Sequence, residues 1–217
     1  MNLEQARHNM IMQQIRPWDV IDERVLEAMQ QIPREEFVPE AYKNFALADF
    51  EIPLNAEQKM MFPRVEGRLL QALDIQEDDN ILEIGTGSGY VTALLAKLGK
   101  NVTSVEIDVD LAQSAKEKLA AHGCNNASVI EGDGVKGWNT QAPYDVILIQ
   151  ASLMEIPKCF YEQLRVSGRM VAVMGSAPVM NAVLVKRLNA NNFDTVHLFE
   201  TDIAPLINQS IKKHFDF

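Results

Sequence analysis

The segment Asn80–Tyr90, with the sequence NILEIGTGSGY, constrains the fold more than any other part of the chain. An apolar run with β-branched residues contains Glu83 near its end and leads into three glycines at alternate positions, Gly85, Gly87 and Gly89. From position 91, apolar residues recur at i, i+3, i+4 and i+7, which predicts an amphipathic helix. A strand, a glycine turn and a helix in this order predict the first unit of a nucleotide-binding α/β sheet. The glycines allow a sharp turn and leave bare main chain for a ligand to approach.

After position 64 the chain alternates between strand patterns and helix patterns. The last two strand patterns are close enough to form a hairpin-type pair. Alternating β and α units imply a mostly parallel sheet. We expect strands at 81–84, 102–106, 127–130, 144–150, 169–174, 183–187 and 195–199, with helices at 65–73, 90–98, 111–119 and 157–164.

The first 63 residues have a different pattern, with helices and irregular loops broken by prolines. Ile21, Val25, Leu26 and Met29 share one helical face, and Asp22 is placed to cap that helix. We therefore expect a helical and loop extension over residues 1–63. It should cover the side of the ligand site at which an acceptor substrate binds. Residues 64–217 are expected to form a single ligand-binding core.

Composition excludes several classes of protein. The net charge of −10 over 217 residues argues against nucleic acid as the principal partner. The longest apolar runs are the length of a strand, far short of the ~20 residues that span a membrane. The N-terminus lacks the apolar core of a secretory signal, and the two cysteines and four histidines match no metal or disulfide spacing. These features predict a protein of the reducing cytoplasm with no metal site.

The glycine pattern also discriminates between nucleotides. A dinucleotide fold uses G-x-G-x-x-G, whereas here Tyr90 stands in place of the last glycine. Glu83 would repel a pyrophosphate but favours a cationic ligand. A nucleophile elbow is excluded because Gly87 stands where its serine belongs. S-adenosyl-L-methionine carries an ammonium and a sulfonium and no phosphate, so it suits this loop, with S-adenosyl-L-homocysteine as its product. A purely structural glycine turn is the alternative.

Two further acids follow the next two strands. Glu106 ends the second strand, where a carboxylate can accept hydrogen bonds from both ribose hydroxyls. Asp133 follows the third strand, where it can accept one from the adenine amino group. Ligands of such sheets bind outside the carboxyl ends of the strands, so the acids are expected to converge there. The expected cofactor-binding residues are Glu83, Gly85, Thr86, Gly87, Ser88, Gly89, Glu106, Ile107, Asp133, Gly134 and Gln150.

More motifs run through the rest of the chain. They are R-V-L-E-A-M (Arg24–Met29), P-R-E-E-F-V-P-E (Pro33–Glu40), E-G-D-G (Glu131–Gly134), Y-D-V-I-L-I (Tyr144–Ile149), E-I-P (Glu155–Pro157) and E-Q-L-R-V-S-G-R-M (Glu162–Met170). Together with the glycine segment, they make nearly the whole chain resemble the protein-L-isoaspartate O-methyltransferase family.

This resemblance implies both a fold and an activity. The fold is a doubly wound, mostly parallel, seven-stranded α/β sheet of the Rossmann-like type found in methyltransferases that use S-adenosyl-L-methionine. The activity is that of a cytoplasmic repair enzyme, which methylates the α-carboxylate of isoaspartyl residues in damaged proteins or peptides. The ester then collapses to a succinimide, part of which reopens as normal aspartate.

The family positions its acceptor with a loop of pattern G-H-G-Q-T-I-S-Q-P, which reads N-A-E-Q-K-M-M-F-P here (Asn55–Pro63). Gln58 matches the family, while Lys59 replaces the threonine and Met61 replaces the serine. The resemblance makes Gln58, Lys59 and Met61 the expected acceptor-side residues. A thioether donates no hydrogen bond. The loop is therefore either a packed helix entry or a more apolar pocket for a different acceptor.

Three functions follow from these observations. The first is isoaspartyl repair, on whole-chain resemblance. The second is a related methyltransferase for another acceptor, such as a small molecule, because of Met61. The third is a non-catalytic binding module that has kept the glycine loop as a scaffold. The N-terminal helix is a candidate either to cover the acceptor cleft or to form a homodimer contact.

Overall fold

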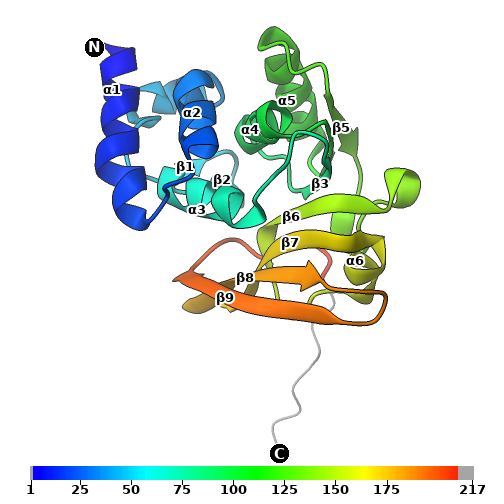
Figure 1. Cartoon of the computed structure of the whole chain (residues 1–217). Coiled ribbons are helices and arrows are strands. Elements are labelled where there is room, and N and C mark those ends of the chain that lie inside the picture. Colours follow the sequence, from blue (N-terminus) through cyan, green and yellow to red (C-terminus); the bar gives the residue numbers. More distant parts are fainter. Residues whose placement is uncertain (1, 210–217) are drawn as a thin grey trace, which may run out of the picture.

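The structure is a computed structural model that describes residues 2–209 (Figure 1). Its centre is a seven-stranded sheet in the order β5-β4-β3-β6-β7-β8-β9. The first five strands in this order run parallel, and β8 and β9 complete the sheet as antiparallel neighbours. The mostly parallel sheet and its late antiparallel pair are confirmed. The strands are β3 (Asn80–Ile84), β4 (Asn101–Glu106), β5 (Ala127–Glu131), β6 (Tyr144–Leu153), β7 (Leu164–Ser176), β8 (Val179–Arg187) and β9 (Phe193–Thr201).

Helices cover both faces of the sheet, as a doubly wound fold requires. The central strand β6 alternates its side chains between two hydrophobic clusters. Val146 and Leu148 pack with the helices of one face, and Ile147 and Ile149 pack on the other face with Phe160. The first face carries α3 (Pro63–Leu73), α4 (Tyr90–Leu98) and α5 (Val109–Ala121), and the second carries α6 (Lys158–Gln163).

Local sequence explains where these helices begin. Pro63 occupies the first turn of α3, where its missing N–H costs nothing. Asp108 caps α5 by accepting hydrogen bonds from two backbone N–H groups, and Asp22 caps α2 by accepting one from Arg24. The expectation for Ile21 was wrong. It precedes the cap and is 71% exposed, so it does not share the buried face of α2.

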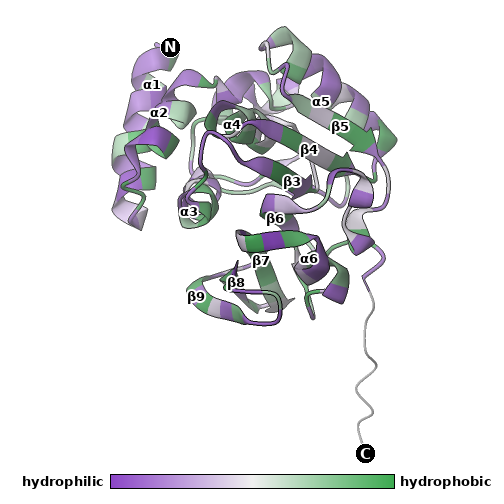
Figure 2. Ribbon diagram, turned by 45° about the vertical axis from the view of Figure 1, so that its right-hand side comes forward, coloured by the Kyte–Doolittle hydropathy of each residue, from purple (hydrophilic) through white to green (hydrophobic). Residues whose placement is uncertain are grey.

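The N-terminal extension packs onto the first face of the sheet beside α3 (Figure 1). Met10, Met29 and Phe37 join the same hydrophobic cluster as α3 and α4. Figure 2 shows hydrophilic residues over most of α1, the outermost helix. The extension comprises α1 (Leu3–Met10), a π-helical turn (Ile11–Ile15), α2 (Glu23–Gln31), 3-10 turns (Arg16–Trp18, Arg34–Glu36 and Glu40–Phe45) and a hairpin of β1 (Ile52–Pro53) and β2 (Lys59–Met60).

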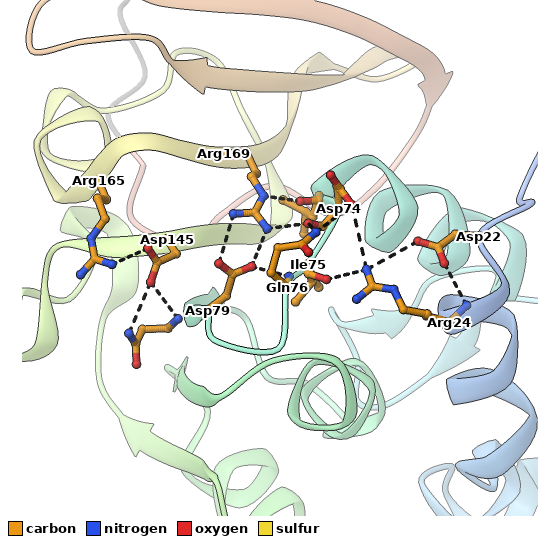
Figure 3. Close-up of polar contacts among 11 residues, drawn as sticks. Asp22, Arg24, Asp74, Ile75, Gln76, Asp79, Asp145, Arg165 and Arg169 are labelled. Atoms are coloured by element: carbon orange, nitrogen blue, oxygen red, sulfur yellow. Dashed lines mark hydrogen bonds and ion pairs between the residues drawn. The ribbon is translucent and has the colours of Figure 1, made fainter.

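Ion pairs fill the edge of the sheet where the parallel strands begin (Figure 3). Arg169 pairs with Asp79 and donates to the carbonyls of Leu73 and Asp74, at 2.6 and 2.5 Å. Asp145 accepts a hydrogen bond from the backbone N–H at the start of β3. This edge is therefore closed by structural contacts. Within residues 2–209, no helix is both long and apolar enough to cross a membrane.

Candidate functional site

A cavity of about 360 Å³ opens at the opposite edge, at the carboxyl ends of β3, β4 and β6. The register brings these ends level, because Ile84 pairs with both Val105 and Ile149. The chain runs from β3 outward to β5 and then returns to β6 on the other side, and ligands of open α/β sheets bind at such switch points. The predicted residues that line this cavity are Gln58, Lys59, Met61, Gly85, Thr86, Gly87, Ser88, Glu106, Ile107, Asp133, Gly134 and Gln150.

The glycine loop forms one wall of this cavity. Gly87 has φ +53°, and a Cβ there would lie 3.3 Å from the side chain of Leu54, so the loop passes close to the hairpin of the extension. The hydroxyl of Thr86 is hydrogen-bonded to Ser104, which fixes the loop to β4. Ser88 accepts a hydrogen bond from the N–H of Tyr90 at 3.2 Å and so completes the turn into α4.

Gly89 and Glu83 do not line the cavity, and here the site differs from our expectation. A Cβ at Gly89 would lie 3.1 Å from the Cβ of Ala115, so this glycine allows α4 and α5 to pack closely. Glu83 is fully buried behind the loop, where it accepts hydrogen bonds from Thr92 and Ser104 at 2.5 Å. Both residues support the glycine loop from behind.

Burial raises the pKa of Glu83 to about 8, although hydrogen bonds from Ser104 and Thr92 act to lower it. Burial therefore favours the protonated form of this side chain more than it would be favoured in an exposed glutamate. Because Glu83 lies behind the loop, it does not face the cavity as we expected.

Glu106 is the acid that does face the cavity. It is only 2% exposed, and its two oxygens accept hydrogen bonds from the N–H groups of Gly87 at 2.8 Å and Asp108 at 3.0 Å. A carboxylate oxygen can accept two hydrogen bonds, so each keeps capacity for a hydroxyl donor. This arrangement fits a ligand with two neighbouring hydroxyls.

Asp133 and Gly134 form the end of the cavity near β5. Asp133 caps a short turn by accepting from Val135 N at 2.9 Å, and its other oxygen accepts from the amide of Asn208 at 2.9 Å. A Cβ at Gly134 would come within 2.7 Å of Ile84. The glycine therefore allows this turn to pack directly on Ile84, which also lines the cavity.

Gln150 is the last residue of the predicted strand 144–150, lies within β6 and lines both cavities. Its amide nitrogen donates to Glu83 at 2.6 Å and to the carbonyl of Gly85 at 2.9 Å. Both donor hydrogens are thus used within the protein. The amide oxygen is left as the group that can accept a hydrogen bond from a ligand.

The acceptor loop is a short hairpin, which the sequence did not predict. Its turn is closed by Asn55, whose side chain contacts Gln58 and also donates to Asp108, the cap of α5, at 3.0 Å. Met61 is 7% exposed, joins the hydrophobic cluster and also lines the cavity. Met61 therefore has features of both expected alternatives: it packs in the core and it forms part of an apolar cavity wall.

A second cavity of about 650 Å³ adjoins the first beside the hairpin. Lys59 is the one cation among the described residues that line it, and its ammonium lies 3.5 Å from Glu51. Glu57 and Asp202 add negative charge to its walls. The residues that line both cavities are Glu57, Lys59, Met61, Gln150, Ala204 and Pro205.

Sequence reasoning missed the C-terminal wall of the site. Residues 204–207 line the first cavity after β9 has ended, and Pro205 forms a bridge to Ser152 beside β6. An apolar A-P-L-I run is the only signal there, and it does not indicate where the chain returns. Within the described part of the chain, no group of three or more His, Cys, Asp or Glu side chains is arranged to hold a metal ion.

Comparisons with known proteins match the whole of this architecture. The profile of the family described as protein-L-isoaspartate(D-aspartate) O-methyltransferase matches residues 5–210. A protein-L-isoaspartate O-methyltransferase of Koribacter versatilis is 42% identical over 205 residues, which cover 94% of this chain and 91% of the relative. A protein of the same name from Rhodopseudomonas palustris is 38% identical over 199 residues, covering 91% of each.

Two solved structures share the fold. A protein-L-isoaspartate O-methyltransferase has a TM-score of 0.80 at 24% identity, covering 93% of this chain and 65% of that one. A Plasmodium falciparum protein of this description, solved with S-adenosyl-L-homocysteine, has a TM-score of 0.79 at 18% identity, covering 95% and 98%.

Proposed function

The chain belongs to the protein-L-isoaspartate(D-aspartate) O-methyltransferase family, and we propose that it methylates the α-carboxylate of isoaspartyl residues in damaged proteins with S-adenosyl-L-methionine. The observation that carries this proposal is the family match over residues 5–210, because it spans both the cofactor cavity and the acceptor hairpin. A different acceptor and a non-catalytic module are less favoured, since the full-length relatives carry the name of the repair enzyme.

The lining of the first cavity fits S-adenosyl-L-methionine. Glu57, Glu106 and Asp133 outnumber Lys59, the one cation among the described residues of its lining, so the walls suit a cationic ligand and disfavour a pyrophosphate. The proposed contacts are Glu106 with the ribose hydroxyls and Asp133 with the adenine amino group. When bound, the cofactor supplies an electrophilic methyl carbon on a sulfonium sulfur.

The chain needs no general base for this reaction. A carboxylate is ionised at neutral pH and already carries the attacking electron pair. The task of the protein is to hold the acceptor in line with the methyl group, and orientation alone can supply about 7–11 kcal/mol of a barrier. We assign this task to the acceptor hairpin. Lys59 attracts the carboxylate, Gln58 shapes the wall of the first cavity, and Met61 shapes the walls of both.

The proposal also includes a homodimer, a covering role for the N-terminal extension and a cytoplasmic location. Leu3 and Met12 are 42% and 45% exposed near the N-terminus, which supports a homodimer contact through α1 and the turn after it. The packing of the hairpin beside the cavities supports a covering role for residues 1–63. A cytoplasmic location is supported by Cys124 and Cys159, which are both free thiols.

The proposal is tested by transfer of a tritiated methyl group to an isoaspartyl peptide and to its aspartyl twin. We expect base-labile methyl ester on the isoaspartyl peptide alone. A crude metabolite extract serves as the third acceptor. Label that appears only in the extract, or on neither peptide although the cofactor binds, would contradict the isoaspartyl assignment.

A further inference from the structure

Arg34 is fully buried, at 0% exposure, in the short turn Arg34–Glu36 of the extension. Its Nε and Nη2 donate to the two carboxylate oxygens of Glu66, at 3.2 and 3.1 Å. Nη2 also donates to the carbonyl of Met61 at 2.7 Å, and Nη1 donates to the carbonyl of Ala46 at 3.0 Å. The guanidinium carbon lies 5.4 Å from the centre of the Tyr90 ring. One side chain therefore joins four segments of the molecule.

Three of these four contacts lead to the site, although Arg34 lines neither cavity. Met61 belongs to the acceptor hairpin segment and lines both cavities. Glu66 lies in the first turn of α3 and lines the first cavity. Tyr90 is the first residue of α4, directly after the glycine loop. The guanidinium thus stands between the acceptor half and the cofactor half of the site.

Stability alone does not account for a charged pair at this place. Desolvation of a buried ion pair offsets most of its attraction, and apolar residues of similar volume are often as stable. An arginine offers something else, because its planar fork fixes the direction of several hydrogen bonds at once. The contact with Glu66 is such a two-point pair, and it leaves Nη2 directed at the carbonyl of Met61.

We propose that Arg34 is a positioning residue, which holds the acceptor segment at Met61 in register with the cofactor loop and thereby aligns the acceptor carboxylate with the methyl donor. This inference rests on the proposed methyl transfer. In a direct displacement, a misplacement of about 1 Å can cost about 100-fold in rate. Loss of the guanidinium is therefore expected to lower kcat strongly, while the melting temperature changes little.

The test replaces the pair by apolar side chains of similar size, in the double variant R34M/E66M. We expect melting within a few degrees of wild type, a cofactor affinity within about threefold, and a kcat on the isoaspartyl peptide about 10- to 100-fold lower. A folded double variant with the wild-type kcat would overturn the proposal. Should the double variant fail to fold, R34K takes its place, with the same fall in kcat expected, because an ammonium cannot reproduce the fork.

A control variant separates positioning from other effects. R169K is the matched control, because Arg169 makes the same kinds of contact at the far edge of the sheet (Figure 3). It should lower the melting temperature and leave kcat within about twofold.

Hydrogen exchange gives a readout that needs no turnover. The backbone N–H groups of residues 54–62 should exchange faster in R34K than in wild type, while those of β3 and β4 keep their rates. Equal exchange at 54–62 would contradict the proposal. If wild type makes no ester on an isoaspartyl peptide, the proposed function fails, and this exchange measurement still decides whether Arg34 positions the segment.

Discussion

At the residue scale, the two acids of β3 and β4 show how position along a strand divides similar side chains between different tasks. Both lie at or next to the end of a strand, and the sequence assigned both to the cofactor. Glu83 pairs with Ser104 in the sheet register, so Glu106, two residues further along β4, lies on the same face but nearer the edge of the sheet. Glu83 is on the face that α4 covers, where Thr92 and Ser104 bind it. Glu106 turns back toward the glycine loop instead.

This division was only partly predictable from the sequence. Ile84, the neighbour of Glu83, packs on the face opposite α4, so the alternation already places Glu83 under the helix. The hydrogen-bond partners of Glu83 come from residues 9, 21 and 67 positions away. Contacts at such separation depend on tertiary packing, which a local pattern does not contain.

Glu83→Gln should flatten the dependence of stability on pH. The pKa of Glu83 is about 8 in the folded chain, against an ordinary value of 4.5. Between these values the folded chain holds a proton that the unfolded chain has lost, so the free energy of unfolding falls as pH rises from about 4.5 to about 8. Outside that window Glu83 adds no pH dependence to the free energy of unfolding.

Thermal denaturation at several pH values between about 5 and about 8 measures this slope. Burial also raises the pKa of Glu66, but Glu66 is present in both proteins and cancels in the comparison. An identical slope in wild type and Glu83→Gln would show that Glu83 does not carry the proton.

At the element scale, long elements were predictable and short ones were not. The apolar periodicity of α4 gave its bounds at Tyr90–Leu98, because nine residues contain more than two helical turns. The strands β1 and β2 have two residues each, too few for any alternation. Their hairpin is held instead by Asn55 and by its contact with Asp108, which lies 53 residues away.

Met61→Ser tests whether this hairpin keeps the geometry of the family. A serine hydroxyl at this wall can donate to the acceptor carboxylate, and such a bond is worth about 1.5–3 kcal/mol. We expect turnover of the isoaspartyl peptide to rise about tenfold. Met61 is also buried, so the melting temperature should fall, by the mechanism that costs about 2–5 kcal/mol in large-to-small core substitutions.

Initial rates at saturating cofactor, together with melting curves, measure both effects. Met60→Ser is the matched control, because Met60 is equally buried in the same hairpin, at 5% exposure. It should lower stability without raising the rate. A rate that does not rise for Met61→Ser would show that the wall no longer places a donor at the carboxylate.

At the scale of the whole molecule, the two edges of the sheet have different tasks. The edge where the parallel strands begin is closed by Arg169, Asp79 and Asp145 (Figure 3). The opposite edge collects the strand ends around the cavity. That convergence was predictable, because parallel strands bring all their carboxyl ends to one edge. The closing wall at 204–207 was not, since it depends on where the chain returns after β9.

The central claim is that this open edge binds the adenosyl cofactor through Glu106. Calorimetric titration of S-adenosyl-L-homocysteine into wild type, Glu106→Ala and Glu131→Ala tests it most directly. Glu131 is the partner of Glu106 in the sheet register, but it is exposed and pairs with Lys116 outside the cavity. We predict affinity about 10- to 100-fold weaker for Glu106→Ala and within about twofold of wild type for Glu131→Ala. Equal affinity of wild type and Glu106→Ala would contradict the account.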